Sequence, residues 1–237
     1  MSTIATNIAK VGTRIREAAQ AAERDPDEVL LLAVSKTQPA EAIREASEAG
    51  LHDFGENYLQ EALEKQAELA DLPLVWHFIG PIQSNKTKLI AEHFDWVHSV
   101  DRLKIAQRLS DQRPDHLPPL NLCLQVNVSG EASKSGCEPQ EVHELAQAIA
   151  ALPRLRLRGL MAIPEPTDDP AEQRAAFARL RQLQSELPLD LDTLSMGMSQ
   201  DLEAAIAEGA TWVRIGTALF GARAYPSQVA ADAPPHD

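Results

Sequence analysis

Short apolar segments alternate with amphipathic segments eight times along this sequence, and this alternation restricts the possible folds more than any other feature. The apolar segments are nearly continuous in character, as strands are when both faces of a parallel sheet are covered. We therefore predict eight strands separated by helices. The predicted strands span residues 29–34, 51–54, 74–78, 94–97, 120–126, 155–160, 191–194 and 212–215.

The segments between these strands carry apolar residues three or four positions apart, which is the spacing of one helix face. An additional helix over residues 4–24 precedes the first strand, because its isoleucines and Val11 repeat at that spacing. The other predicted helices span residues 39–49, 56–70, 84–91, 101–111, 140–150, 170–186 and 199–207, with a short one from residue 217.

Eight strand–helix units in a chain of 237 residues fit a closed (β/α)8 TIM barrel of the α/β class, with an extra N-terminal helix. An open, doubly wound sheet is the alternative, but no GxGxxG motif follows any predicted strand. We predict one barrel domain over residues 1–225. The composition of residues 226–237 predicts a disordered tail.

The composition excludes several classes of function. The 22 Lys and Arg residues against 35 Asp and Glu residues give a formal net charge of -13, which disfavours binding to nucleic acids and to anionic membranes. The two cysteines, Cys123 and Cys137, lack zinc-site spacing and are too few for a disulfide scaffold, so we expect no metal site. No segment has membrane-spanning length and no export signal is visible, so we expect a cytoplasmic protein.

Lys36 follows the apolar run of the first predicted strand, and the six residues before it carry no charge. In a barrel of this kind, functional side chains lie at the carboxyl ends of the strands. Removing an amine from water lowers its pKa and leaves more of it neutral, which suits Schiff-base chemistry. The alternative interpretation is a lysine that ends the strand and extends into solvent.

Glycine and hydroxyl residues follow the last two predicted strands. Gly197, Ser199 and Asp201 occupy one strand-to-helix turn, and Gly216 and Thr217 occupy the next. Glycine allows close approach of the backbone to an anion, and free N–H groups at a helix start point toward it. These turns predict a phosphate site, as barrels often form after strands seven and eight. Alternatively, the hydroxyl residues are ordinary helix caps.

Charged and polar residues within the strands are less specific. Arg214 lies inside an apolar strand and needs an acceptor, either a ligand atom or a buried acidic residue such as Glu56. His52, His77 and His98 fall near strand ends without metal-ligand spacing, and we expect each to pack at the rim of the barrel.

Eight motifs occur in a recognisable order: AVSKTQP, FGENYLQE, WHFIGPIQSNK, HSVD, QVNVSGEASKSG, GLMAIP, LSMGMSQD and VRIGTALFG. Through them the sequence closely resembles the pyridoxal phosphate homeostasis protein family (YggS/PROSC type) from about residue 29 to residue 223. The resemblance implies a barrel similar to the N-terminal domain of alanine racemase. It also implies that pyridoxal 5'-phosphate is the cofactor, bound by Lys36, Asn57, Met161, Ser199, Arg214, Gly216 and Thr217.

The roles follow from the same resemblance. Lys36 would hold the cofactor as a lysine aldimine, while Ser199, Gly216 and Thr217 would bind the phosphate. Arg214 would face the pyridine nitrogen. Asn57 would lie near the ring, and Met161 would pack beside it.

The resemblance implies a monomeric protein that contributes to vitamin B6 homeostasis, by buffering the cofactor or delivering it to apo-enzymes, without robust catalysis. Arginine stays protonated and donates to the ring nitrogen, which leaves the ring a weaker electron sink. Racemases of similar fold also use a tyrosine from a second domain, for which the predicted barrel leaves no room. The two tyrosines here are Tyr58 and Tyr225.

Two alternatives remain at this stage. One is a pyridoxal-phosphate-dependent amino-acid racemase or lyase, although neither Tyr58, at a helix start, nor Tyr225, near the tail, is well placed in the sequence as its base. The other is an aldolase of (β/α)8 fold that uses Lys36 directly on a carbonyl substrate.

Overall fold

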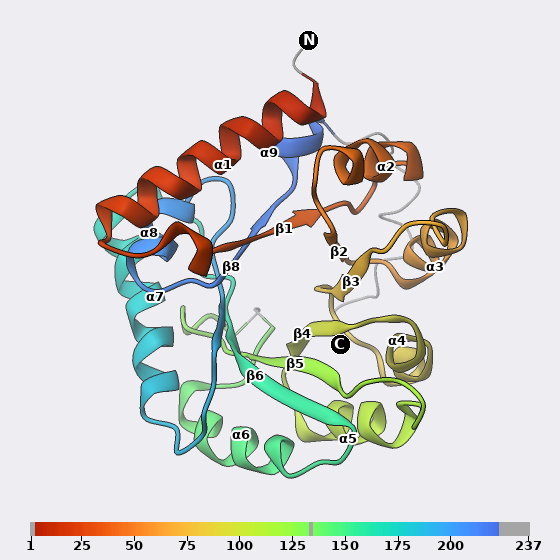
Figure 1. The fold of residues 1–237 in the computed structure, drawn as a ribbon. Helices are drawn as coiled ribbons and strands as arrows, with labels where there is room; N and C mark the ends of the chain where they lie inside the picture. Colours follow the sequence, from red (N-terminus) through yellow and green to blue (C-terminus); the bar gives the residue numbers. More distant parts are fainter. Residues whose placement is uncertain (1–2, 133–134, 223–237) are drawn as a thin grey trace.

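A computed structural model describes residues 3–132 and 135–222. Within that part of the chain, eight parallel strands form a closed barrel in which each strand pairs with its neighbours in sequence and the last pairs with the first (Figure 1). The predicted (β/α)8 fold is therefore confirmed. The predicted tail, residues 226–237, and Tyr225 lie outside the described residues. The strands are β1 (Leu30–Val34), β2 (Asp53–Glu56), β3 (Val75–Phe78), β4 (Trp96–Val100), β5 (Leu120–Gln125), β6 (Leu155–Met161), β7 (Thr193–Ser195) and β8 (Trp212–Ile215).

Helices follow the strands and surround the barrel (Figure 1). Apolar side chains of the helices pack against the outward faces of the strands and form one large core between the two layers. The helices are α2 (Ala40–Glu48), α3 (Leu59–Glu68), α4 (Thr87–His93), α5 (Leu103–Gln112), α6 (Val142–Ala150), α7 (Pro170–Ser185), α8 (Leu202–Ala207) and α9 (Thr217–Phe220).

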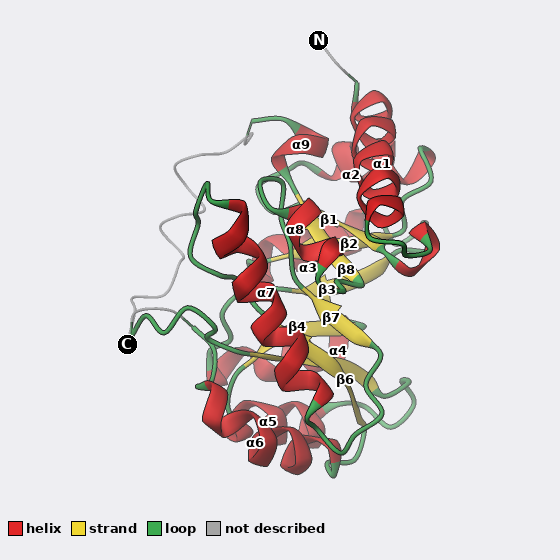
Figure 2. Cartoon of the chain, turned by 90° about the vertical axis from the view of Figure 1, so that its left-hand side faces the viewer, coloured by secondary structure: helices red, strands yellow, loops and turns green. Residues whose placement is uncertain are grey.

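The extra helix α1 (Ile4–Ala21) precedes the barrel and lies beside α8 and α9 in both views (Figures 1 and 2). Thr3 caps its start, and Val11, Ile15 and Ala19 are its buried face. Its polar side chains also reach the loops that end the barrel. Asn7 Nδ2 donates to Leu219 O at 2.8 Å, and Arg14 Nη2 donates to Ser199 O at 2.9 Å. The helix therefore holds the last two strand-to-helix connections in place.

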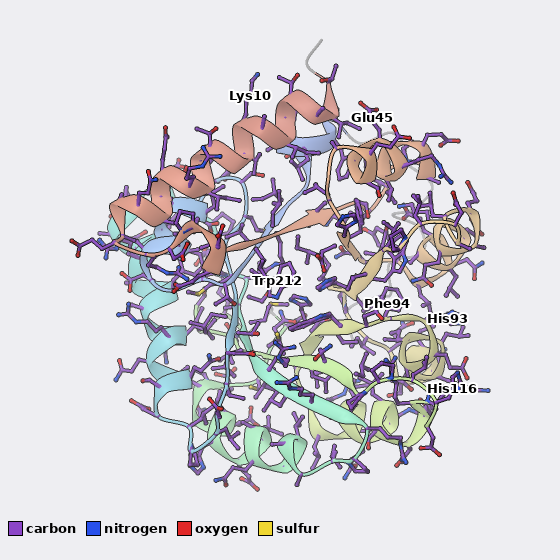
Figure 3. The ribbon with its side chains drawn as sticks, in the orientation of Figure 1. Lys10, Glu45, His93, Phe94, His116 and Trp212 are labelled. Carbon is purple, nitrogen blue, oxygen red and sulfur yellow. The ribbon has the colours of Figure 1, made fainter. Side chains whose placement is uncertain are left out.

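The interior of the barrel differs from the core outside it because it contains polar and aromatic side chains. The indole of Trp212 lies inside the ring of strands, whereas Lys10 and Glu45 point outward from their helices (Figure 3). Trp96 and Trp212, from β4 and β8, contact each other with ring centroids 5.9 Å apart. Trp96 also belongs to a small buried apolar cluster with Cys123 and Met161.

Two predicted boundaries are wrong for an identifiable reason. Glu56 was expected to begin a helix, but it ends β2 and pairs with Phe78 of β3. Its carboxylate is fully buried against Lys65 of α3, so strand pairing with β3 and this ion pair outweigh its helix propensity. The helix after β7 begins at Leu202 rather than residue 199, because residues 196–201 form the connecting loop.

Among the described residues, no helix combines the length and the apolar character that crossing a bilayer requires.

Candidate functional site at the carboxyl ends of the strands

Lys36 lies in a tight turn immediately after β1. Ser35 is fully buried, and Thr37 has a φ of 63°, which is rare for a β-branched residue. Such strain persists only where neighbouring contacts hold the backbone, and it concentrates at functional sites. Here the Thr37 N–H donates to Glu61 Oε1 at 2.6 Å. The turn that carries Lys36 is therefore held in one conformation from α3.

The parallel registers bring several predicted site residues together. Val34 pairs with Gly55, and Ser35 N donates to Gly55 O at 3.0 Å, so Lys36 and Asn57 follow the ends of adjacent strands. On the other side, Ala33 pairs with Ile215 and Gly216 packs against Val34. Lys36 therefore stands between the β2 end, with Asn57, and the β8 end, with Gly216 and Thr217.

A buried ion cluster lies directly beneath the Lys36 turn. Lys65 Nζ from α3 donates to Ser35 O at 2.7 Å and lies 2.8 Å from Glu56 Oε1 and 2.7 Å from Glu61 Oε1. Ser35 Oγ also donates to Glu56 Oε1, at 2.8 Å. The side chains of Lys65 and Glu56 are 7% and 0% exposed, so the ion pair is shielded from solvent. Lys65 thus binds the Ser35 carbonyl, which precedes Lys36, and also Glu61. The Glu61 carboxylate in turn accepts from the Thr37 N–H, which follows Lys36.

This cluster should make stability depend on pH. Burial raises the pKa of Glu56 from 4.5 to about 7, although the charge and hydrogen bond of Lys65 oppose the rise. The folded state then binds a proton more tightly than the unfolded state, so this contribution to stability is complete below the unfolded pKa and is lost as the pH rises through 7.

Glu56→Gln removes the ionisation. We expect the stability of Glu56→Gln relative to wild type to rise by roughly 2.5 kcal/mol between pH 5 and pH 8, measured by urea unfolding. An equal difference at both pH values would contradict the assignment.

The turn after β7 is built around Gly197. Its φ is +100°, and a Cβ there would lie 2.6 Å from the Ala205 Cβ, so only glycine fits. Gly197 O accepts from Arg214 N at 2.9 Å, which ties this turn to β8. Met198 N donates to Asp201 Oδ1 at 2.7 Å, and the intervening Ser199 is partly exposed. Ser199 and the Gly216–Thr217 turn thus lie at the ends of adjacent strands, as predicted for a phosphate site.

Arg214 projects into the barrel interior and is 4% exposed. Its Nη1 donates to Ser195 Oγ at 2.7 Å, and its Nη2 donates to Ala162 O at 3.0 Å. Burial lowers its pKa to about 10, and the nearby Asp201 charge opposes that shift. The expected alternative of an ion pair with Glu56 is wrong, because Glu56 is bound to Lys65. These two bonds use two of the five guanidinium N–H groups.

Sequence reasoning missed the polar residues inside the barrel. His77 and His98 were expected at the rim, but both are fully buried in the interior. They join Asp53 to Ser195 through hydrogen bonds of 2.7–2.9 Å. His52 alone of the three is exposed. The sequence signal that could have placed them inside the barrel was a histidine at the third position of β3 and of β4, each strand also carrying an aromatic residue. Hydrophobic periodicity, however, cannot identify the hydrogen-bond partner of either ring.

Unsatisfied polar atoms gather at the mouth beside Lys36. Within the described chain, the buried atoms Thr37 Oγ1 and Asn57 Oδ1 have no hydrogen-bond partner. Such groups are costly in a protein interior, so they indicate a polar ligand or ordered water at this position. Met161 differs: it ends β6 and is fully buried against Trp96 and Cys123. Tyr58 is the N-cap residue of α3, follows Asn57 in the chain and is partly buried.

Comparison with known proteins identifies the family of this chain. The family described as alanine racemase, N-terminal domain, matches residues 6–224. The pyridoxal phosphate homeostasis protein of Pseudomonas aeruginosa is 79% identical over 225 residues, which cover 95% of this chain and 98% of the relative. The protein of the same name from Escherichia coli is 56% identical over 235 residues, covering 95% and 99%.

Solved structures show the same fold. PipY of Synechococcus elongatus, solved with PLP (pyridoxal 5'-phosphate) bound, is 46% identical with a TM-score of 0.78. The match covers 87% of this chain and 100% of the PipY chain. Alanine racemase of E. faecalis is 18% identical with a TM-score of 0.67, covering 92% of this chain and 62% of that protein. The second likeness concerns the fold alone. From the family match and the identity across nearly its whole length, this chain belongs to the pyridoxal phosphate homeostasis protein family, whose barrel is that of the alanine racemase N-terminal domain.

Proposed function

We propose that this chain is a cytoplasmic, monomeric carrier that binds pyridoxal 5'-phosphate covalently through Lys36 and contributes to vitamin B6 homeostasis without robust catalysis. The observation that carries the proposal is the position of Lys36, at the carboxyl end of β1 and next to the Gly216–Thr217 turn. The relative PipY, solved with PLP bound, supports the same ligand.

The residues at the mouth fit this cofactor. When bound, pyridoxal 5'-phosphate supplies an aldehyde that condenses reversibly with an amine and releases water. Lys36 would supply the amine, and Asn57 Oδ1, which lacks a protein partner in the described chain, would accept from a polar group of the ring. Ser199, Gly216 and Thr217 would bind the phosphate, because their turns expose backbone N–H groups and hydroxyls at adjacent strand ends.

Arg214 would keep the ring nitrogen of the cofactor unprotonated. A guanidinium carries only donors, so it offers the nitrogen a hydrogen bond and does not accept a proton from it. A ring nitrogen without a proton withdraws electrons less strongly than one paired with a carboxylate. This residue therefore favours storage of the cofactor over carbanion chemistry. Met161 would pack near the ring from the interior side.

Lys36→Ala tests the proposal directly. We expect the wild-type protein, incubated with pyridoxal 5'-phosphate, to show a visible absorption band that borohydride fixes on the peptide containing Lys36. Lys36→Ala should lose the band and the label, while the control Lys10→Ala, which changes an exposed lysine of α1, should keep both. A wild-type protein that stays colourless would overturn the proposal.

Two further measurements separate a carrier from an enzyme. The loaded carrier should reactivate an apo-enzyme that depends on the cofactor, and amino acids should give no turnover at ordinary enzymatic rates. Turnover at such rates would overturn the non-catalytic part of the proposal and favour a racemase or lyase. Size-exclusion chromatography tests the monomeric state.

A further inference from the structure

An unbroken series of hydrogen bonds crosses the barrel from its amino-terminal end to Arg214. Asp53 Oδ1 lies 2.8 Å from His77 Nε2, and His77 Nδ1 lies 2.9 Å from His98 Nε2. His98 Nδ1 lies 2.7 Å from Ser195 Oγ, which accepts from Arg214 Nη1 at 2.7 Å. Since β4 and β7 are not adjacent, the bond between His98 and Ser195 passes through the interior. We call these five residues the interior chain.

The Asp53 carboxylate at one end and a single proton on each ring set the direction of every bond. A carboxylate can only accept, so His77 Nε2 donates to Asp53, and a neutral His77 then accepts at Nδ1 from His98 Nε2. A neutral His98 in turn accepts at Nδ1 from the Ser195 hydroxyl, whose oxygen accepts from Arg214 Nη1. Each imidazole then accepts at Nδ1 and donates from Nε2, which is the neutral form. Burial lowers the pKa of both His77 and His98, in keeping with neutral rings.

Aromatic contacts hold the first ring of the series in place. Trp96 stacks on His77 with centroids 5.5 Å apart and an interplanar angle of 12°. Trp212 meets the same ring edge-on at 5.0 Å, and the Arg158 guanidinium covers the Trp96 ring at 4.6 Å. The His77 ring cannot rotate without displacing these indoles. These contacts fix the His77 ring in the orientation that both of its hydrogen bonds require.

The interior chain also connects the buried Arg214 cation to a carboxylate. In the described part of the chain, the acceptors of the Arg214 guanidinium are a hydroxyl and a backbone carbonyl, both neutral. The series connects that cation to the Asp53 carboxylate, whose side chain is 30% exposed at the opposite end of the barrel. Hydrogen bonds that point the same way polarise one another in a low-dielectric interior. The series therefore connects the Arg214 cation to the Asp53 carboxylate, in addition to the charge of Asp201, which acts on Arg214 directly.

We propose that Asp53, His77, His98 and Ser195 are positioning residues that act through Arg214, fixing its guanidinium toward the ligand at the mouth of the barrel. The inference rests on the proposed function, because the ligand atom that Arg214 faces is the ring nitrogen of the cofactor. The four residues do not touch the ligand themselves. They determine which donors of Arg214 remain for it.

The first test uses the cofactor-free protein and does not depend on the proposed function. NMR of protein labelled with 15N-histidine should show His77 and His98, assigned with His77→Asn and His98→Asn, as neutral rings protonated at Nε2. In Ser195→Ala, the Nδ1 signal of His98 should move because its donor is lost. The control Ser110→Ala removes a buried hydroxyl that donates to Pro153 O, and it should leave both rings unchanged. A His98 ring protonated at Nδ1 in the wild type would overturn the interior chain.

The second test measures the effect on bound cofactor. Loss of one hydrogen bond to a charged group corresponds to about a tenfold change in an equilibrium constant. We expect Ser195→Ala to release pyridoxal 5'-phosphate about tenfold faster than Ser110→Ala and to shift the absorption maximum. Asp53→Asn, which removes only a distant charge, should shift the maximum in the same direction. Asp71→Asn, which breaks an exposed pair with Arg44, should not.

The outcomes separate the two claims. Failure of the wild type to bind the cofactor defeats the proposed function, whereas the NMR result still decides whether the interior chain exists. Normal binding with the same spectrum and release rate in Ser195→Ala, Asp53→Asn and their controls would overturn the positioning role.

Discussion

Lys65→Met should lower the free energy of unfolding by about 3–5 kcal/mol at pH 8, because it leaves buried carboxylates without their cation. Lys65 Nζ contacts Glu56, Glu61 and the carbonyl of Ser35, and the substitution removes all three contacts together. Methionine fills a similar volume, so the loss reports the charge rather than a cavity. Urea unfolding of both proteins measures the difference.

A surface pair provides the control for this prediction. Lys88 lies 3.8 Å from Glu92 with its side chain 70% exposed, so Lys88→Met should change stability by less than about 0.5 kcal/mol. The penalty of Lys65→Met should also shrink near pH 5, since Glu56, with its pKa raised to about 7 by burial, is then protonated. Adding Glu56→Gln should recover part of the loss at pH 8. A penalty below about 1 kcal/mol at pH 8 would show that the cluster is not a closed ion pair.

Gly159→Ala should destabilise the barrel by at least about 3 kcal/mol or prevent folding, because the close approach of β6 and β7 leaves no room for a side chain. A Cβ at Gly159 would overlap the Thr193 carbonyl oxygen and lie 2.9 Å from Gln184 Oε1. That amide oxygen accepts from Leu160 N at 2.9 Å, so it cannot move without losing a strand contact. The barrel can accommodate this Cβ only if β6 and β7 move apart, which a closed barrel resists.

Gly12→Ala is the matched control for the glycine substitution. Gly12 lies inside α1, and a Cβ there meets nothing within 4 Å. Alanine is a better helix former, so this variant should be more stable by about 1 kcal/mol. The same chemical change thus has opposite expected signs at two positions. Thermal unfolding of both variants decides the matter, and a Gly159→Ala protein as stable as wild type would mean that β6 and β7 lie farther apart than the structure places them.

The strands and the site at their carboxyl ends were largely predictable. Each strand is a local apolar run, so its end, and the turn that follows it, can be identified without knowing its neighbours. Lys36 and the turns at Gly197 and Gly216 were predicted to share one end of the barrel because parallel strands require it. The structure brings Lys36 and the Gly216 turn to adjacent strands. Their roles toward the cofactor stay predictions.

The partners of the buried charges were not predictable in the same way. Glu56 was considered for Arg214, but its partner is Lys65, nine residues away on the following helix. His77 and His98 looked like separate residues at the rim, yet they form one series with Ser195, which lies 97 residues from His98. Nothing in local spacing distinguishes these partners.

The order of strands and helices, and with it the set of residues at the mouth, follows from local sequence, because hydrophobic periodicity is a property of neighbouring residues. Which buried polar groups meet inside the barrel depends on the tertiary structure. Those contacts depend on closure of β8 onto β1 and on the registers between strands, which place side chains from distant segments face to face.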